Sequence, residues 1–250
     1  MKEHGRPAAH DEARGGGSTP PPPPPWSCRL DAIVWWHRAG PGAAAALPEA
    51  LTEALRAPRR LPVTLAAVVR YAETPVGPYG ELAGSPLLLL DGGRVAGHVP
   101  FIAVDSVASA DAGRGLWALP KVMAAFTWPA GPLGAAAAEA TVRHGEGAWS
   151  VAVRVHPRRA RVPFAVAGRC LQVDEEGRRL AFPVHGVGLA APARARVAVG
   201  GPEAPAWLRD GDHAALVLSR TRVRVGRAAP PQACSSAGSP SMLTALFSAE

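Results

Sequence analysis

Lys121 is the residue whose type and surroundings most clearly suggest chemistry. It lies in the almost uncharged stretch GLWALPKVMAAF at residues 115–126. The chain has 27 lysines and arginines, of which only Lys2 and Lys121 are lysines. Arginine stays protonated, whereas a buried lysine can lose its proton and attack a ketone as a neutral amine, forming a Schiff base. We therefore predict an imine-forming amine at Lys121. The alternative is a lysine whose stem covers apolar surface while its ammonium reaches solvent.

A carboxylate in a second segment could work with such an amine. Residues 70–82 read RYAETPVGPYGEL. Gly77, Pro78 and Gly80 predict a bend after a strand, and Glu81 then enters the apolar run that leads to Leu87. Glu81 is therefore either a solvated edge residue or a buried general acid and base that shuttles protons.

The elements that must position these residues are mostly strands. The strongest helix pattern covers residues 48–56, where Pro48 begins the first turn and leucines recur every four residues. Asp91, Gly92 and Gly93 predict a hairpin turn. Apolar runs bounded by turn residues predict strands at residues 30–37, 62–72, 87–90, 95–104, 121–128, 138–144, 149–155, 164–166, 194–199 and 214–225.

Many short strands with little helix predict a mainly β fold, either a barrel or a sandwich. We expect this domain to span residues 26–227. Residues 1–25 contain a GGGS segment and six consecutive prolines, which predict a disordered Gly- and Pro-rich leader. Residues 228–250 are small and polar in their first half, which predicts a flexible C-terminal tail.

Composition argues against several other classes of protein. The formal net charge is +7, but the arginines are scattered and no aromatic-interleaved basic motif is present, so we expect no nucleic-acid partner. The uncharged stretch at residues 122–138 is broken by prolines and glycines, so we expect no membrane span. The first twenty residues contain no apolar signal segment, so we expect a cytoplasmic protein.

Other candidate sites are weak. The eight histidines share no metal-ligand spacing, so we expect no metal site. No nucleotide-binding fingerprint is present, so we expect no cofactor. Asp105, Ser106 and Ser109 lack the surroundings of a nucleophilic serine and are interpreted as turn residues. The cysteines lack C-x-x-C spacing, which argues against a disulfide framework made from Cys28, Cys170 and Cys234.

The two segments together resemble the acetoacetate decarboxylase-like superfamily. The resemblance rests on YAETPVGPYGEL at residues 71–82, VDS at residues 104–106, GR at residues 113–114 and WALPK at residues 117–121. It is clear over residues 30–130 and extends to residue 225. It implies a closed antiparallel β-barrel with a few short helices, a small keto acid as substrate, no cofactor, and a homo-oligomer as one possible assembly.

The resemblance also implies roles for individual residues. The family's lysine that follows a proline forms the Schiff base, which points to Lys121. The glutamate of the family's Gly-Pro-Tyr-like segment is an acid and base, which points to Glu81. An arginine near the N-terminus holds the substrate carboxylate in the decarboxylases, and Arg29 is the nearest candidate. Arg114 is expected either to support the lysine loop or to form a structural ion pair. The substrate-contact candidates are Arg29, Arg114, Tyr79 and Trp117.

Two places depart from the family's pattern. The decarboxylases carry a second lysine where this chain has Val122, and a second glutamate at a place that falls near Ala66.

Our first hypothesis is a Schiff-base lyase that acts on a small keto acid, with acetoacetate decarboxylation as its default reaction. An aldolase-dehydratase acting on pyruvate or another 2-oxo acid is the alternative within this class. A non-catalytic barrel that binds a small apolar ligand is the second hypothesis, and a basic interaction protein is the third.

Overall fold

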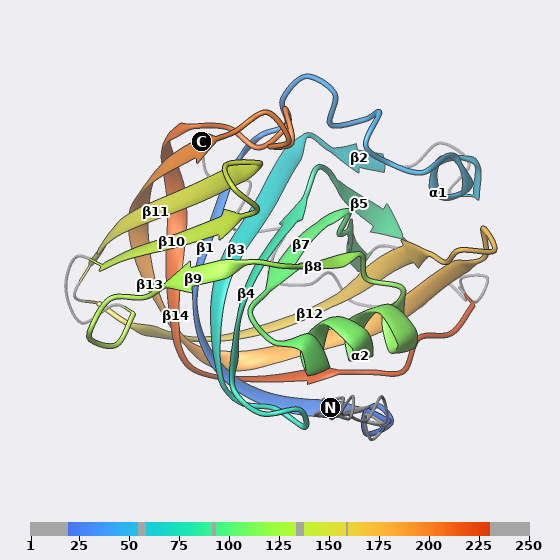
Figure 1. The fold of residues 1–250 in the computed structure, drawn as a ribbon, viewed down its shortest axis with the longest axis horizontal. Coiled ribbons are helices and arrows are strands. Elements are labelled where there is room, and N and C mark those ends of the chain that lie inside the picture. Colours follow the sequence, from blue (N-terminus) through green and yellow to red (C-terminus); the bar gives the residue numbers. More distant parts are fainter. Residues whose placement is uncertain (1–19, 55–58, 92–93, 134–137, 159, 231–250) are drawn as a thin grey trace, which may run out of the picture.

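The structure is a computed structural model that describes residues 20–54, 59–91, 94–133, 138–158 and 160–230 (Figure 1). The described residues form fourteen strands and two helices. The helices are α1 (Glu49–Ala54) and α2 (Val107–Trp117). The strands are β1 (Trp26–Arg38), β2 (Arg59–Leu61), β3 (Val63–Glu73), β4 (Tyr79–Ser85), β5 (Leu88–Asp91), β6 (Arg94–His98), β7 (Phe101–Val104), β8 (Lys121–Met123), β9 (Ala125–Thr127), β10 (Ala138–His144), β11 (Trp149–Pro157), β12 (Val162–Val173), β13 (Arg179–Gly200) and β14 (Gly211–Val225).

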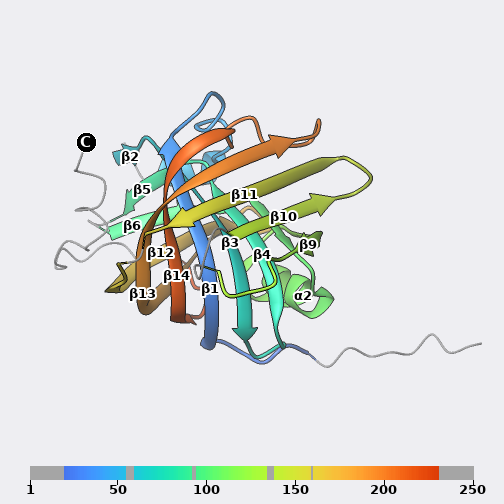
Figure 2. The same cartoon turned by 90° about the vertical axis from the view of Figure 1, so that its left-hand side faces the viewer.

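All the strands belong to one sheet, whose main path runs β2-β5-β6-β12-β13-β14-β1-β3-β4-β7-β8. Every pair along this path is antiparallel except β6–β12 and β7–β8. Strand β11 joins β10 to β13, and β10 pairs with β9. Only Ala124 separates β8, the last strand of this path, from β9. Strands β10 and β11 then connect β9 to β13 by strand pairing (Figure 2). The predicted mainly β fold with short helices is confirmed.

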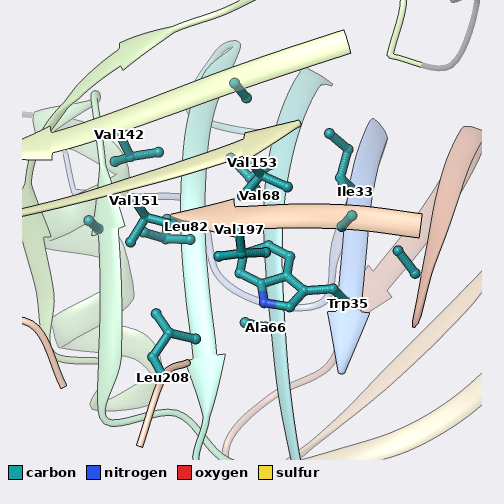
Figure 3. Packing of buried hydrophobic residues seen from close by; sticks show 14 of the residues in the cluster. Ile33, Trp35, Ala66, Val68, Leu82, Val142, Val151, Val153, Val197 and Leu208 are labelled. Atoms are coloured by element: carbon teal, nitrogen blue, oxygen red, sulfur yellow. The ribbon is translucent and has the colours of Figure 1, made fainter. Parts of the chain in front are cut away.

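Alternating residues of these strands give the sheet two buried faces. Trp35, Val68 and Leu82 point into the main hydrophobic core between the strands (Figure 3). The neighbouring positions Tyr71 and Glu81 lie on the opposite face of β3 and β4, with partly or fully buried side chains. Successive residues of a strand point to opposite faces, so one strand can contribute both to the core and to a separate site. Burial of each large side chain in this core contributes about 1.5–3 kcal/mol to the stability of the scaffold.

Helix α2 was not predicted, and Ser106 and Ser109 are not turn residues. Ser106 is the N-cap of α2, and its hydroxyl accepts a hydrogen bond from the backbone N–H of Ser109. The helix ends at Ala118, which adopts a left-handed conformation with φ of 52°. Two glycines within eleven residues weaken the intrinsic helix propensity, which hides this helix in the sequence. Packing against β7 and β8 stabilises it nonetheless.

Most predicted strands are present, with altered boundaries. The hairpin of β5 and β6 is confirmed, although its predicted turn residues Gly92 and Gly93 lie outside the described residues. The strand expected over residues 95–104 is divided into β6 and β7 around Pro100, which has no N–H to donate to a neighbouring strand. Helix α1 agrees with the predicted helix up to residue 54, beyond which the structure describes no residue before 59.

The two predicted tails lie largely outside the described residues, as does Cys234. The last prolines of the predicted leader are described, and the Trp26 indole N–H donates a hydrogen bond to the Pro22 carbonyl at 2.7 Å. Pro22 is therefore tied to the first residue of β1. In the part of the chain that the structure describes, neither helix is long and apolar enough to cross a membrane.

His98 makes the stability of this fold depend on pH. Its side chain is buried, and its Nδ1 donates to the Leu171 carbonyl on the neighbouring strand at 3.0 Å. Burial lowers the pKa of His98 below its ordinary value, so the unfolded chain binds a proton at this residue more readily than the folded chain. The neutral His98 ring stabilises the fold fully above pH 6.5, the ordinary pKa of histidine. This contribution is lost as the pH falls from 6.5 through the lowered pKa of the folded protein.

We therefore expect the free energy of unfolding to fall more steeply between pH 7.5 and pH 5 in the wild-type protein than in a His98→Gln variant. Urea unfolding at both pH values measures this difference. Other titrating groups, including His37, are common to both proteins and cancel in the comparison. Equal slopes for the two proteins would contradict the prediction.

Candidate active site

The Lys121 ammonium is buried and held by two side chains. Lys121 is the first residue of β8, and only 4% of it is exposed. Its Nζ donates one hydrogen bond to Glu81 Oε2 at 2.8 Å and another to Ser109 Oγ at 3.0 Å. The lysine therefore does not reach solvent with its ammonium, which was the alternative considered from the sequence. It forms a buried ion pair with the glutamate of the second segment.

Strand β7 brings the lysine and the glutamate together. It pairs with β4 on one side, where Val104 lies opposite Glu81, and with β8 on the other, where Ile102 lies opposite Lys121. Helix α2 runs from β7 to the lysine loop and supplies Ser109. The three groups therefore converge between the helix and one face of the sheet, outside the main core.

The turn between α2 and β8 fixes the approach of the lysine. The backbone N–H groups of Ala118 and Leu119 bond to the carbonyls of Arg114 and Gly113. The Lys121 side chain then passes directly over Gly113. A Cβ atom on this glycine would lie 2.5 Å from Lys121 Cδ, so the helix must present a bare backbone at this position.

Two tyrosines complete the surroundings of the ion pair. The Lys121 Nζ lies 5.2 Å from the centre of the Tyr79 ring, a cation–π distance. Tyr79 stacks on Tyr71 with their ring centres 4.5 Å apart. The Tyr71 hydroxyl donates to Glu81 Oε1 at 3.4 Å. Burial and the nearby Glu81 carboxylate raise the pKa of both tyrosines well above the ordinary value, so both hydroxyls remain protonated donors.

Cys28 is a further buried neighbour. Burial raises the pKa of its thiol to about 11, with an additional rise from Glu81 and an opposing effect of Lys121. The thiol is therefore protonated and unreactive near neutral pH. Sequence reasoning singled out none of Ser109, Tyr71 and Cys28 as site residues. Tyr71 lies in the segment that carries the family resemblance, whereas nothing near Ser109 or Cys28 in the sequence indicates their proximity to Lys121.

Two of the predicted substrate-contact residues, Arg29 and Trp117, lie away from the ion pair. Arg29 is exposed and forms an ion pair with Glu73 at 3.1 Å. Its neighbour on the strand, Cys28, is buried and points to the opposite face of the sheet. Trp117 is buried in a small cluster with Trp26, and its indole N–H donates to the Gly226 carbonyl at 2.8 Å. The structure thus places Trp117 in packing contacts and Arg29 at the surface.

Arg114 contacts the lysine through the backbone. Its Nε donates to the Lys121 carbonyl at 3.0 Å, and a second guanidinium nitrogen donates to the same oxygen. The third nitrogen lies 3.7 Å from Asp111. Arg114 therefore supports the lysine loop and forms a surface ion pair, so both roles expected from the sequence are present together.

The two places that depart from the family's pattern belong to the other face of the sheet. Ala66 lies in the main core, and Val122 packs against that core.

An open surface cavity of about 740 Å³ borders the lysine loop and is lined in part by Asp174, Glu175 and Glu176. Among the described residues, no group of three His, Cys, Asp or Glu side chains is arranged to hold a metal ion.

Ser109 is expected to position the amine. A Ser109→Ala variant leaves the Lys121 ammonium with one acceptor fewer, and hydrogen bonds to charged groups contribute about 1.5–3 kcal/mol. We expect the rate of adduct formation at Lys121 to fall about tenfold, which corresponds to roughly 1.4 kcal/mol. Borohydride trapping of carbonyl adducts over time measures this rate.

Ser106→Ala is the matched control for Ser109→Ala. It removes the cap of the same helix, which costs about 1 kcal/mol of stability, and leaves the hydrogen bond to Lys121 in place. Equal trapping rates in the wild type and Ser109→Ala would show that the serine does not position the amine.

Known proteins resemble this chain in sequence pattern and in fold. The family model described as acetoacetate decarboxylase matches residues 8–166, more than half of the chain. No curated protein matches the chain. A solved structure from structural studies of acetoacetate decarboxylase is 12% identical, with a TM-score of 0.60, and the match covers 87% of this chain and 94% of that one.

Two further solved structures share the fold. The acetoacetate decarboxylase of Legionella pneumophila is 11% identical, with a TM-score of 0.54, and the match covers 89% of this chain and 93% of that one. The enduracididine biosynthesis enzyme MppR, complexed with the condensation product of pyruvate and imidazole 4-carboxaldehyde, is 14% identical, with a TM-score of 0.51. That match covers 84% of this chain and 90% of MppR. At these identities the likeness concerns the fold.

Proposed function

Because the chain belongs to the acetoacetate decarboxylase family, we propose that it is a lyase that forms an imine between Lys121 and a small carbonyl substrate, with Glu81 as the proton shuttle. The observation that carries this proposal is the buried contact of 2.8 Å between Lys121 Nζ and Glu81 Oε2. The contact gives the ammonium a base within proton-transfer distance. Both side chains are buried, which strengthens the electrostatic interaction between them.

The first steps follow from this pair. Glu81 accepts a proton from the Lys121 ammonium, and the neutral amine forms a C–N bond with the carbonyl carbon while the C=O π electrons move to oxygen. That oxygen takes the proton from Glu81. Glu81 then removes a proton from the nitrogen and returns it to the hydroxyl group, which leaves as water. The products are a protonated imine and an ionised Glu81, so the charges balance.

The imine activates the bond next to it. The positively charged nitrogen draws in the electron pair of an adjacent C–C or C–H bond, which yields a neutral enamine. Loss of CO₂ from a keto acid is one way to make this enamine, and aldol-type cleavage or proton abstraction is another. In aldol-type cleavage and proton abstraction, Glu81 takes up the proton that the substrate releases, whereas after decarboxylation it takes a proton from water. In each case Glu81 then gives this proton to the enamine carbon, and water hydrolyses the imine and releases the product.

Borohydride trapping tests the proposal. The protein is mixed with acetoacetate or pyruvate and reduced, or mixed with pentane-2,4-dione and left unreduced because its adduct is a stable conjugated enaminone. Each sample is analysed by intact mass and peptide mapping. We expect an adduct on Lys121 with at least one of these compounds and none in a Lys121→Arg variant, because guanidinium stays protonated. If no compound of the panel forms an adduct, the proposed imine chemistry is wrong, and a non-catalytic ligand-binding domain becomes the better hypothesis.

A further inference from the structure

We propose that the substrate of Lys121 is an uncharged ketone or aldehyde and not a keto acid. The inference rests on the proposed imine chemistry and specifies its substrate class. Three features of the site carry it: the charges that are already balanced inside it, the engagement of the nearby arginines, and the charge of the cavity beside the lysine loop.

The charges within the site cancel before any substrate binds. Lys121 and Glu81 form an ion pair, and the other groups that hydrogen-bond to them, the Ser109 and Tyr71 hydroxyls, are neutral. Formation of the protonated imine keeps one positive and one negative charge. A substrate carboxylate would add a second negative charge to a site that is almost fully buried, where an unpaired ion is strongly unfavourable.

The two arginines that the sequence suggested as substrate contacts, Arg29 and Arg114, do not point toward the Lys121–Glu81 ion pair. Arg29 lies at the surface with Glu73 as its partner, and its neighbour Cys28 is the residue that faces the site. Arg114 directs its guanidinium to the Lys121 carbonyl and to Asp111. These two cations are therefore engaged away from the place where a substrate carboxylate would have to lie.

The cavity that borders the lysine loop also disfavours anions. Three consecutive acidic residues, Asp174, Glu175 and Glu176, line it together with Arg114. Arg178 pairs with Asp174 and Glu176 and reduces their charge, but Arg114 has its own acidic partner in Asp111. These carboxylates repel an anion that approaches this side of the lysine loop, whereas they do not repel a neutral carbonyl compound.

This substrate class favours aldol-type chemistry. An uncharged ketone bound as an imine loses a proton from the adjacent carbon to Glu81, which gives the enamine. The enamine carbon can form a C–C bond with an aldehyde, and the resulting alkoxide takes the proton from Glu81. Water then hydrolyses the imine, so no oxidant or reductant is required. The reverse sequence cleaves a β-hydroxyketone.

A pair of nearly isosteric compounds tests the inference. Pentane-2,4-dione carries an acetyl group where acetoacetate carries its carboxylate. A methyl group therefore replaces one carboxylate oxygen, so the two compounds have nearly the same shape and only acetoacetate is charged. We expect the dione to half-saturate adduct formation at Lys121 at a concentration about 100-fold lower than acetoacetate, in line with the cost of an unpaired buried charge. Comparable or tighter reaction of acetoacetate overturns the inference and leaves the imine chemistry intact. Absence of adducts with both compounds overturns the proposed function and this inference with it.

A Glu81→Gln variant tests the electrostatic cause. The substitution keeps the shape of the side chain but removes the negative charge, so a substrate carboxylate can then pair with the imine nitrogen. We expect the preference for the dione over acetoacetate to shrink at least tenfold, even though both adducts form more slowly. The ratio is independent of the overall loss of rate. An unchanged ratio would show that charge balance does not select the substrate, and would overturn the inference.

Discussion

In a Lys121→Met variant we expect the rates of adduct formation and turnover to fall by at least about 1,000-fold, because the nucleophile is removed. The same change is expected to destabilise the fold. It leaves Glu81 with the Tyr71 hydroxyl as a partner but without its counter-ion, and breaking a buried ion pair in this way costs about 3–5 kcal/mol. Urea unfolding measures the second effect and borohydride trapping the first.

The double variant Lys121→Met/Glu81→Gln separates these two effects. With both charges removed, the site holds neutral groups of similar volume, and such replacements are often nearly neutral for stability. We expect the double variant to regain most of the lost stability and none of the activity. A Lys121→Met protein that still forms adducts would place the reactive amine elsewhere. A Lys121→Met protein with wild-type stability would show that the ion pair is not buried in solution.

A Gly113→Ala variant is expected to lose about 100-fold in the rate of adduct formation while it remains folded. The new methyl group would lie 2.5 Å from Lys121 Cδ and 2.6 Å from Cε, so the lysine stem must move away from α2. A displacement of about 1 Å of a reacting group can cost 100-fold in rate. The stability cost of the crowding is about 1–3 kcal/mol, partly offset by the better helix propensity of alanine.

Gly115→Ala is the matched control for Gly113→Ala. It lies in the same helix, but a Cβ atom there would meet no other atom within 4 Å. We expect it to stabilise the protein by up to about 1 kcal/mol and to leave adduct formation unchanged. Unfolding midpoints and trapping rates of the three proteins are compared side by side. If both variants trap adducts at the wild-type rate, the close contact between Gly113 and the lysine stem does not control the position of the amine.

The types and local surroundings of residues determined much of this protein. Lysine and arginine differ in how readily they lose a proton, so a lysine in an arginine-rich chain is informative without any structure. Alternating apolar runs predicted most strands, because the two faces of a strand meet different environments. The hairpin between β5 and β6 followed from its turn residues. These properties are local, and so the sequence carries them directly.

The tertiary structure decided which residues meet. Lys121 and Glu81 are 40 residues apart and come together only because β7 pairs with both of their strands. Ser109 reaches the amine from α2, a helix whose glycines weaken the sequence signal and which tertiary packing stabilises. Arg29 and Cys28 are adjacent in sequence, yet only the cysteine faces the site, because neighbouring residues of a strand point to opposite sides. Strand pairing and side-chain direction depend on contacts between distant segments, and those contacts exist only in the folded chain.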